Sequence, residues 1–292
     1  MKVGEMSGIK KIGVVAKRNK PEAIDTIKEL VPFLSERGIE TILDEETAKL
    51  AGEVSALKGE DIPKSSDMVI VLGGDGTLLY AARLVGKKEI PILGVNLGSL
   101  GFLTDVALEE LFVTIEKVLA GKFRIEERMM LNAVVTASDG KTSDYSVLND
   151  VVINKGVLAR IINLEVFVNG VYLTTYNADG LIVSTPTGST GYSLSAGGPV
   201  VHPTISVIII NPICPHTLTN RPILVPGDSE IEIKLHSEDS NVFVTLDGQV
   251  GVDFVGGTSV VVSKSERKVH LIEPPERDYY DVLRTKLKWG GK

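Results

Sequence analysis

The sequence predicts an α/β domain with a doubly wound parallel sheet, followed by an antiparallel β-sandwich. Over residues 1–125, short apolar runs alternate with segments of helical period, which is typical of a parallel sheet covered by helices. Beyond that point apolar residues recur at every second position, as in half-buried antiparallel strands. A chain of 292 residues with 43% hydrophobic residues is long enough to bury two separate cores.

The first part yields alternating strands and helices. Four apolar runs are predicted as strands, at residues 12–16, 39–43, 68–72 and 90–95. Three segments with apolar residues on one helical face are predicted as helices, at residues 21–36, 78–84 and 107–119. Pro32 predicts a kink or early stop in the first helix, which Gly38 ends, and Thr104 and Asp105 are candidate N-caps of the third.

The second part reads as paired antiparallel strands. Asn169-Gly170 is a type I′ hairpin signal between predicted strands at residues 162–168 and 171–175. Residues 231–235 and 242–246 alternate in the same way. These patterns predict the β-sandwich.

Composition excludes several classes of protein. The net charge of −7 offers no general attraction to nucleic acid or to an anionic membrane. No apolar run is long enough to span a bilayer, and no secretory signal precedes the first strand. The single cysteine, Cys214, fits a reducing compartment and is expected in the core, and the four isolated histidines indicate no built-in metal site. We therefore expect a soluble, cytoplasmic protein.

The segment of residues 69–79 carries the strongest chemical signal. A buried strand ends in Gly73-Gly74-Asp75-Gly76-Thr77, so one carboxylate lies among glycines at the carboxyl end of a parallel strand. Ligands bind at that edge of open α/β sheets, and glycine lets the backbone approach a phosphate chain. A tight turn is the alternative, because Gly and Asp are preferred turn residues. We interpret Asp75 as a reacting group.

Two further polar groups stand next to apolar runs. Asn149-Asp150 interrupts an apolar stretch, where a buried polar pair needs hydrogen-bond partners that a ligand can supply. Asp179 precedes the apolar run 180–184, and its alternative interpretation is a strand-start turn. We expect both positions to be used in function.

Residues 187–195 follow that run and are rich in Gly, Ser and Thr. They offer hydroxyls, backbone N–H groups and the ring of Tyr192, on which a planar base can stack. A helix beginning near Thr190 would place its N-terminus where an anion is favoured. The alternative is a Ser/Thr capping run around a core tyrosine.

The motif set favours phosphoryl transfer to an alcohol. The sequence contains neither a P-loop nor a Gly-x-Gly-x-x-Gly fingerprint of hydride-transfer enzymes. Phosphoryl transfer requires a cradled phosphate chain, an in-line hydroxyl and a base, and a glycine-rich strand end with one aspartate supplies the first and third.

These residues together resemble the NAD kinases of bacterial type. The resemblance rests on residues 73–77, on Asn149-Asp150, on residues 179–199, and on residues 215–218 with 220–222. It implies transfer of the γ-phosphoryl group of ATP to the 2′-hydroxyl of the adenosine ribose of NAD, with a divalent metal such as Mg²⁺. It also implies an α/β nucleotide-fold domain (1–125), a β-sandwich NAD-binding domain (126–275), a tail (276–292) that packs back on the first domain, and a homodimer or homotetramer.

The resemblance also implies a set of site residues. Asp75 is the expected catalytic proton acceptor. The substrate-binding positions are Gly74, Asp75, Gly76, Thr77, Tyr80, Asn149, Asp150, Arg160, Asn177, Asp179, Thr187, Thr190, Gly191, Tyr192, Ser193, Leu194, Ser195 and Gln249. Gly191 departs from the alanine that is frequent in the family, and Asn177 falls at a variable position.

Two other functions fit parts of the pattern. A diacylglycerol-type lipid kinase shares the motif at residues 73–77, but residues 96–103 lack the Asn-Asp pair of that family. A non-catalytic NAD(P) sensor would not need Asp75 among its glycines. Both are weaker readings than an NAD kinase.

Overall fold

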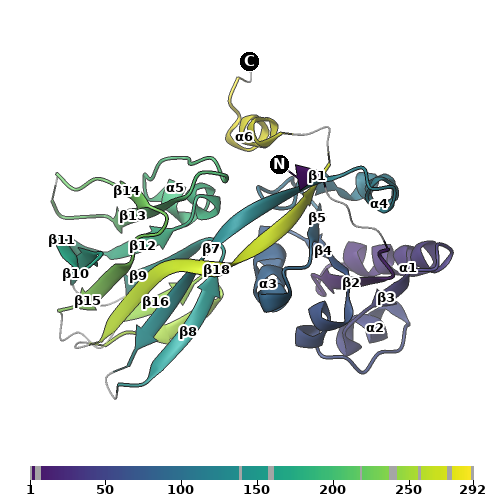
Figure 1. The fold of residues 1–292 in the computed structure, drawn as a ribbon, viewed down its shortest axis with the longest axis horizontal. Coiled ribbons are helices and arrows are strands. Elements are labelled where there is room, and N and C mark those ends of the chain that lie inside the picture. Colours follow the sequence, from purple (N-terminus) through teal and green to yellow (C-terminus); the bar gives the residue numbers. More distant parts are fainter. Residues whose placement is uncertain are drawn as a thin grey trace. The chain divides into compact units, whose positions relative to one another are not determined.

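The computed structural model describes residues 2–3, 8–137, 140–156, 161–217, 219–236, 242–255, 258–274 and 278–290 (Figure 1). The chain forms two compact units. Unit 1 comprises Met1–Glu127 and Val269–Lys292, and unit 2 comprises Arg128–Lys268. The chain passes between the units within β7 (Arg124–Thr136) and within β18 (Ser259–Glu273).

Unit 1 is built on a parallel sheet in the order β3-β2-β4-β5. Its strands are β2 (Lys11–Ala16), β3 (Glu40–Ile42), β4 (Met68–Gly73) and β5 (Ile92–Asn96), with β6 (Val106–Ala107) and the Leu271 end of β18 also parallel to β5. The short β1 (Lys2–Val3) pairs antiparallel with β7. β4 is buried over its whole length because it lies in the middle of the sheet. The predicted α/β domain is confirmed.

Five helices occur in the described part of unit 1. They are α1 (Pro21–Ser35), α2 (Glu45–Ala51), α3 (Asp75–Val85), α4 (Leu111–Leu119) and α6 (Tyr279–Leu287). The buried faces of α1 and α4 join the apolar residues of the sheet in one core. Short 3₁₀ turns connect them at Gly59–Asp61, Pro63–Ser65, Gly86–Lys88 and Leu108–Glu110.

The first and third helices of unit 1 depart from the sequence prediction. The first helix continues through Pro32 and ends at Ser35, and the chain turns three residues later at Gly38, whose φ of 70° is left-handed. Thr104 and Asp105 do not cap the third helix, because β6 and a 3₁₀ turn lie between them and Leu111. The Glu110 carboxylate accepts a hydrogen bond from Ala107 N instead, at 3.2 Å.

Unit 2 is a sandwich of two sheets. One has the order β11-β10-β15-β18, continued by β7 and β8, and the other has the order β14-β13-β12-β9-β16-β17. The strands besides β7 and β18 are β8 (Thr142–Val147), β9 (Asp150–Lys155), β10 (Ile162–Val168), β11 (Val171–Ala178), β12 (Gly180–Ser184), β13 (Val207–Ile213), β14 (Ile223–Pro226), β15 (Ile231–Leu235), β16 (Val242–Leu246) and β17 (Val250–Asp253). Both sheets contribute to a single hydrophobic core, so the predicted β-sandwich is confirmed.

Two local features of unit 2 test the sequence reading. The hairpin of β10 and β11 turns at Asn169 and Gly170, whose φ values of 52° and 75° are both left-handed, as a type I′ turn requires. Cys214, expected in the core, is exposed in the turn after β13, with a φ of 44°. In the ranges that the structure describes, each helix is too short or too polar to traverse a bilayer.

Candidate active site

Asp75 lies in unit 1 at the first residue of α3, one residue beyond the N-cap Gly74. The helix therefore starts earlier than the predicted residue 78, and the carboxylate lies at its positive end. A Cβ added at Gly74 or Gly76 would meet nothing within 4 Å, so the backbone beside Asp75 faces open space. At Gly73 a Cβ would overlap the side chain of Thr77, which folds back over the strand end. Only the middle of the motif is open to a ligand.

The Asp75 carboxylate binds three consecutive backbone N–H groups. Oδ2 accepts from Phe102 N at 3.0 Å, and Oδ1 accepts from Leu103 N at 3.0 Å and from Thr104 N at 3.1 Å. The Thr104 hydroxyl also lies 3.1 Å from Oδ1. Hydrogen bonds from N–H groups to an ionised carboxylate stabilise its charge and hold its orientation.

The loop that supplies these donors is tied to the end of β5. Asn96 donates through Nδ2 to Thr104 Oγ1 at 2.9 Å and accepts from Gly98 N at 2.7 Å. A Cβ at Gly101 would overlap Asp75 Oδ1, so glycine is needed for this close approach. Sequence reasoning did not assign this loop to the site. The pattern that could have indicated it is a glycine-containing segment directly after β5, the buried strand that pairs with β4.

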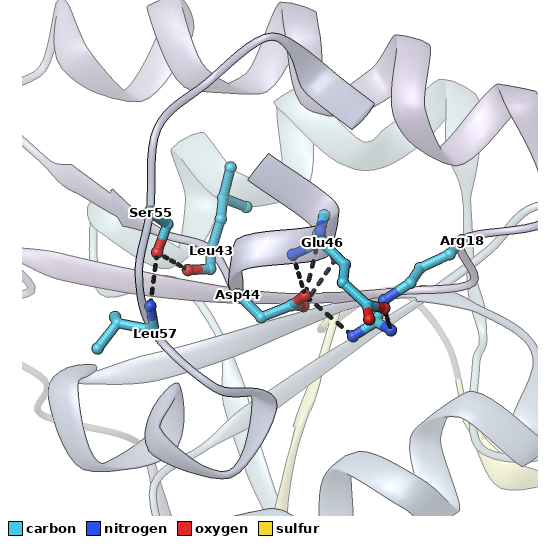
Figure 2. A network of polar contacts seen from close by, with 7 residues as sticks. Arg18, Leu43, Asp44, Glu46, Ser55 and Leu57 are labelled. Atoms are coloured by element: carbon cyan, nitrogen blue, oxygen red, sulfur yellow. Dashed lines mark hydrogen bonds and ion pairs between the residues drawn. The ribbon is translucent and has the colours of Figure 1, made fainter. Parts of the chain in front are cut away.

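Tyr80, a predicted binding residue, lies further along α3 with an exposed ring. It lines a cavity of about 370 Å³ at the carboxyl ends of β2 and β3, together with Arg18, Asp44, Gly59 and Ile62. Figure 2 shows the polar network at its wall: Arg18 pairs with Asp44 at 2.9 Å and with Glu46. Asp44 also caps α2 by accepting from Glu46 N and Thr47 N.

The opposite side of α2 is anchored by a serine. Ser55 donates through Oγ to Leu43 O at 2.6 Å and accepts from Leu57 N at 3.2 Å (Figure 2). The backbone of the 53–57 segment is thereby held beside the end of β3. Leu43, Ser55 and Leu57 line a second cavity, of about 330 Å³, and do not line the cavity beside Tyr80.

Asn149 and Asp150 lie in unit 2 at the start of the central strand β9. Asp150 is buried, with 4% of its surface exposed, and burial together with the charge of Asp247 raises the pKa of its carboxyl to about 7. The Oδ1 atom of Asn149 is also buried and has no hydrogen-bond partner among the described residues. Both side chains have the character of groups that need a ligand.

Asp247 holds the backbone of this pair and was missed by sequence reasoning. Its carboxylate accepts from Leu148 N at 2.9 Å, from Asn149 N at 2.7 Å and from Asp150 N at 3.2 Å. Asp247 and Gly248 have left-handed φ values of 50° and 64° in the turn between β16 and β17. The sequence shows only an Asp-Gly turn there, and nothing local reveals contacts to residues about a hundred positions earlier.

The segment after β12 covers the same pair. Thr185 donates through Oγ1 to Leu148 O at 2.6 Å and through N to Asn149 O at 2.9 Å. A Cβ at Gly188 would overlap Asn149 O. A Cβ at Gly191 would lie 3.5 Å from Asn149 Nδ2 and 3.9 Å from Asp150 Oδ2. The structure thus brings the predicted Gly191 next to the predicted Asn149-Asp150.

The rest of this segment forms two short turns. The expected helix near Thr190 is a 3₁₀ turn, Thr187–Thr190, followed by α5 (Tyr192–Ser195), a single helical turn with few aligned peptide dipoles to favour an anion. Gly191, with φ −93° and ψ −131°, lies outside both the helical and the extended regions and separates the two turns.

The side chains of the predicted binding residues in these turns face different surroundings. Ser193 is fully buried and accepts from Asn211 Nδ2, whereas Tyr192 and Ser195 are exposed and Leu194 is half-buried. Thr190 donates through Oγ1 to Thr187 O at 3.2 Å. The Thr187 hydroxyl is buried and has no partner among the described residues.

The structure does not bring Asn177 and Asp179 to Asn149-Asp150. Gly180 pairs with Asn154, whereas Ser184 pairs with Asp150, so Asp179 lies at the other end of these strands, more than about 13 Å along them. Asp179 forms an ion pair with Lys155 at 2.6 Å. Gln249 is exposed two residues after Asp247, and the predicted Arg160 lies outside the described residues.

A resident metal ion would require several ligand side chains close together among the described residues. These residues contain no group of three or more His, Cys, Asp or Glu side chains that is arranged to hold a metal ion. The carboxylates of the two regions are bound mainly by backbone N–H groups instead.

Comparisons with known proteins cover both units. Residues 12–123 match the family model of the ATP-NAD kinase N-terminal domain, and residues 148–274 match that of the ATP-NAD kinase C-terminal domain. The NAD kinases of Geotalea daltonii and Geobacter sulfurreducens are each 52% identical over 284 residues, covering 97% of this chain and 100% of those proteins.

Solved structures give the same result. Yeast NADH kinase complexed with NADH has a TM-score of 0.91 at 26% identity and covers 98% of this chain and 89% of its own. An NAD kinase from Archaeoglobus fulgidus in complex with ATP has a TM-score of 0.77 at 26% identity and covers 96% of this chain and 100% of its own.

Proposed function

This chain belongs to the NAD kinase family, and from that premise we propose the roles of its individual residues. The reaction is transfer of the γ-phosphoryl group of ATP to the 2′-hydroxyl of the adenosine ribose of NAD, which gives NADP and ADP. The observation that carries the site assignment is Asp75 at the start of α3, beside the open backbone of Gly74 and Gly76.

Asp75 is proposed to accept the proton of the 2′-hydroxyl. A carboxylate offers about four lone-pair directions, and Asp75 accepts four hydrogen bonds from residues 102–104. Oδ1 accepts three of these hydrogen bonds and Oδ2 accepts only the one from Phe102 N, so Oδ2 keeps a lone-pair direction for the ribose hydroxyl.

Asn149 and Asp150 are proposed to bind the ribose and adenine of NAD. The unpartnered Asn149 Oδ1 can accept a hydrogen bond, and ionised Asp150 can accept hydrogen bonds from two hydroxyls. The exposed ring of Tyr192 offers a surface on which a base can stack. Thr187, Thr190, Leu194, Ser195, Gln249, Asn177, Asp179 and Arg160 stay proposed substrate contacts, and buried Ser193 supports the segment from behind.

The donor is proposed to enter as a complex of ATP with a divalent metal such as Mg²⁺. Magnesium commonly binds through one or two carboxylates and the phosphates of a substrate, so it needs no preformed cluster in the described residues. When bound, the metal neutralises charge on the phosphates. We place Thr77 and Tyr80 on the donor side, because both lie on α3 beyond the motif glycines.

We further propose a homodimer or homotetramer that works in the cytoplasm. A chain with one cysteine suits a reducing compartment. Light scattering of the purified protein across a concentration series measures the number of subunits.

A coupled assay tests the function directly. Purified protein with ATP, Mg²⁺ and NAD is expected to form NADP, and diacylglycerol is expected not to stimulate ATP consumption. Replacing ATP by polyphosphate, and NAD by NADH, defines the donor and acceptor. Binding of NAD without any NADP formation would contradict the assignment and support a sensor.

A further inference from the structure

We propose that Asp247 is a positioning residue for NAD binding, and that it acts by holding the backbone of residues 148–150 so that Asn149 and Asp150 face the dinucleotide. The inference rests on the proposed role of Asn149-Asp150 in binding NAD.

The hydrogen-bond geometry carries the inference. The three N–H groups that Asp247 accepts belong to consecutive residues, at 2.9, 2.7 and 3.2 Å, and Asp247 N donates back to Asp150 O at 3.0 Å. Three N–H groups aimed at one carboxylate lie on the same side of the chain. The backbone at the start of β9 therefore turns around Asp247, which sets the directions of the side chains of Asn149 and Asp150.

The turn that presents Asp247 is itself constrained. Asp247 is buried, with 6% of its surface exposed, and its φ of 50° lies in the left-handed region that non-glycine residues seldom adopt. Aspartate tolerates that conformation better than most residues. A simple β-hairpin turn would leave such a side chain in solvent, so the buried orientation is explained by the bonds to residues 148–150.

Asp247 also places a negative charge near Asp150. Around Asp150, β12 contributes the uncharged Ser184, the following segment contributes Gly191, and the turn after β16 contributes Asp247, which is the charged group acting on it among the described residues. Burial and this charge raise the pKa of Asp150 to about 7. Asp247 therefore influences both the direction of Asp150 and the pH above which it is ionised.

The test compares Asp247→Asn with the control Asp253→Asn, which changes an exposed carboxylate on β17 of the same hairpin. An asparagine at 247 keeps the shape but turns one N–H donor toward the backbone N–H groups. For Asp247→Asn we expect the Kd for NAD, measured by calorimetry, to rise about 10-fold. A change of that size corresponds to the loss of about one hydrogen bond between NAD and the site. The KM for ATP should stay within about 2-fold. The control should match wild type in both.

A pH profile separates positioning from mere stability. With Asp247 neutral, the acid limb of NAD binding should move to lower pH by on the order of one unit. In a protein that already carries Asp150→Asn, adding Asp247→Asn should no longer shift the acid limb of the pH profile of NAD binding. Unchanged NAD affinity and an unchanged limb, with only a lower melting temperature, would overturn the inference.

Two further results keep the inference and the proposed function distinguishable. If wild type binds NAD but forms no NADP, the proposed function fails, while the calorimetric comparison still tests Asp247. If Asp247→Asn does not fold, hydrogen exchange of wild type decides: the peptide that contains residues 148–150 should exchange slowly, and more slowly with NAD. Fast exchange there, or exchange unaffected by NAD, would overturn the inference.

Discussion

Each unit of this protein contains an aspartate whose carboxylate binds three consecutive backbone N–H groups. Asp75 in unit 1 binds those of residues 102–104, and Asp247 in unit 2 binds those of residues 148–150. The two differ in what surrounds the carboxylate. Asp75 is half-buried beside two glycines that face open space, whereas Asp247 is buried in a left-handed turn.

The difference indicates that one arrangement serves two purposes. At Asp75 the loop orients the carboxylate, which stays next to open space where a substrate hydroxyl can reach it. At Asp247 the carboxylate orients the loop, and the groups offered to a substrate are those of the loop, Asn149 and Asp150.

The largest expected effect is that of Asp75→Asn. A positioned base contributes about 10²- to 10⁴-fold to a rate, so kcat should fall by that range while NAD still binds. Steady-state kinetics and calorimetry measure the two quantities, with Asp25→Asn on the exposed face of α1 as the control. Turnover near the wild-type rate would exclude Asp75 as the base.

The second effect concerns Asp150 and stability. Its pKa is raised from 3.8 to about 7, so the native state keeps a proton that the unfolded chain has released between those pH values. The free energy of unfolding of wild type therefore falls as the pH rises through this window. Asp150→Asn removes that cost, so the variant should be more stable above pH 7, by at most about 4 kcal/mol, and equal to wild type below pH 3.8.

Thermal unfolding across this pH range checks the prediction. Asp144→Asn, on the exposed part of β8, is the control and should follow the wild-type curve. A stabilisation of Asp150→Asn that does not change with pH would show that ionisation of Asp150 is not its cause.

The third effect compares two glycines of one loop. A Cβ at Gly101 would overlap Asp75 Oδ1, whereas one at Gly98 would meet only Asn96 Oδ1, at 3.9 Å. Gly101→Ala should push the loop from Asp75 and lower kcat by roughly 10- to 100-fold, as misplacement of a reacting group does. Gly98→Ala should leave kcat nearly unchanged in the same assay. Equal rates for the two variants would mean that the loop does not orient Asp75.

The smallest effect is expected for Gly191→Ala. The added Cβ would lie 3.2 Å from Gly188 O and 3.5 Å from Asn149 Nδ2, a crowding that a small shift relieves. The KM for NAD should rise by less than about 3-fold, since a small shift costs well under one hydrogen bond. A large rise would mean that the segment after β12 touches NAD more closely than Asn149 does.

Local sequence patterns predicted the fold and part of the site. Some features depend only on residues that are close in the sequence, so periodicity and turn preferences predict them. They are the buried run of β4, the glycines around Asp75 and the Asn169-Gly170 turn. The contacts of Asp75 with residues 102–104 and of Asp247 with residues 148–150 join distant positions. No local pattern indicates such pairs, so Thr104 was predicted to be a helix cap and Asp247 was given no role.

The exposed position of Cys214 has a practical consequence. It is the only thiol of the chain, so a maleimide probe attaches at one defined place on unit 2 without any substitution. The same thiol can join two molecules covalently when air oxidises it. Subunit numbers measured without a reductant would then count a chemical artefact as assembly, and a Cys214→Ser variant removes that ambiguity.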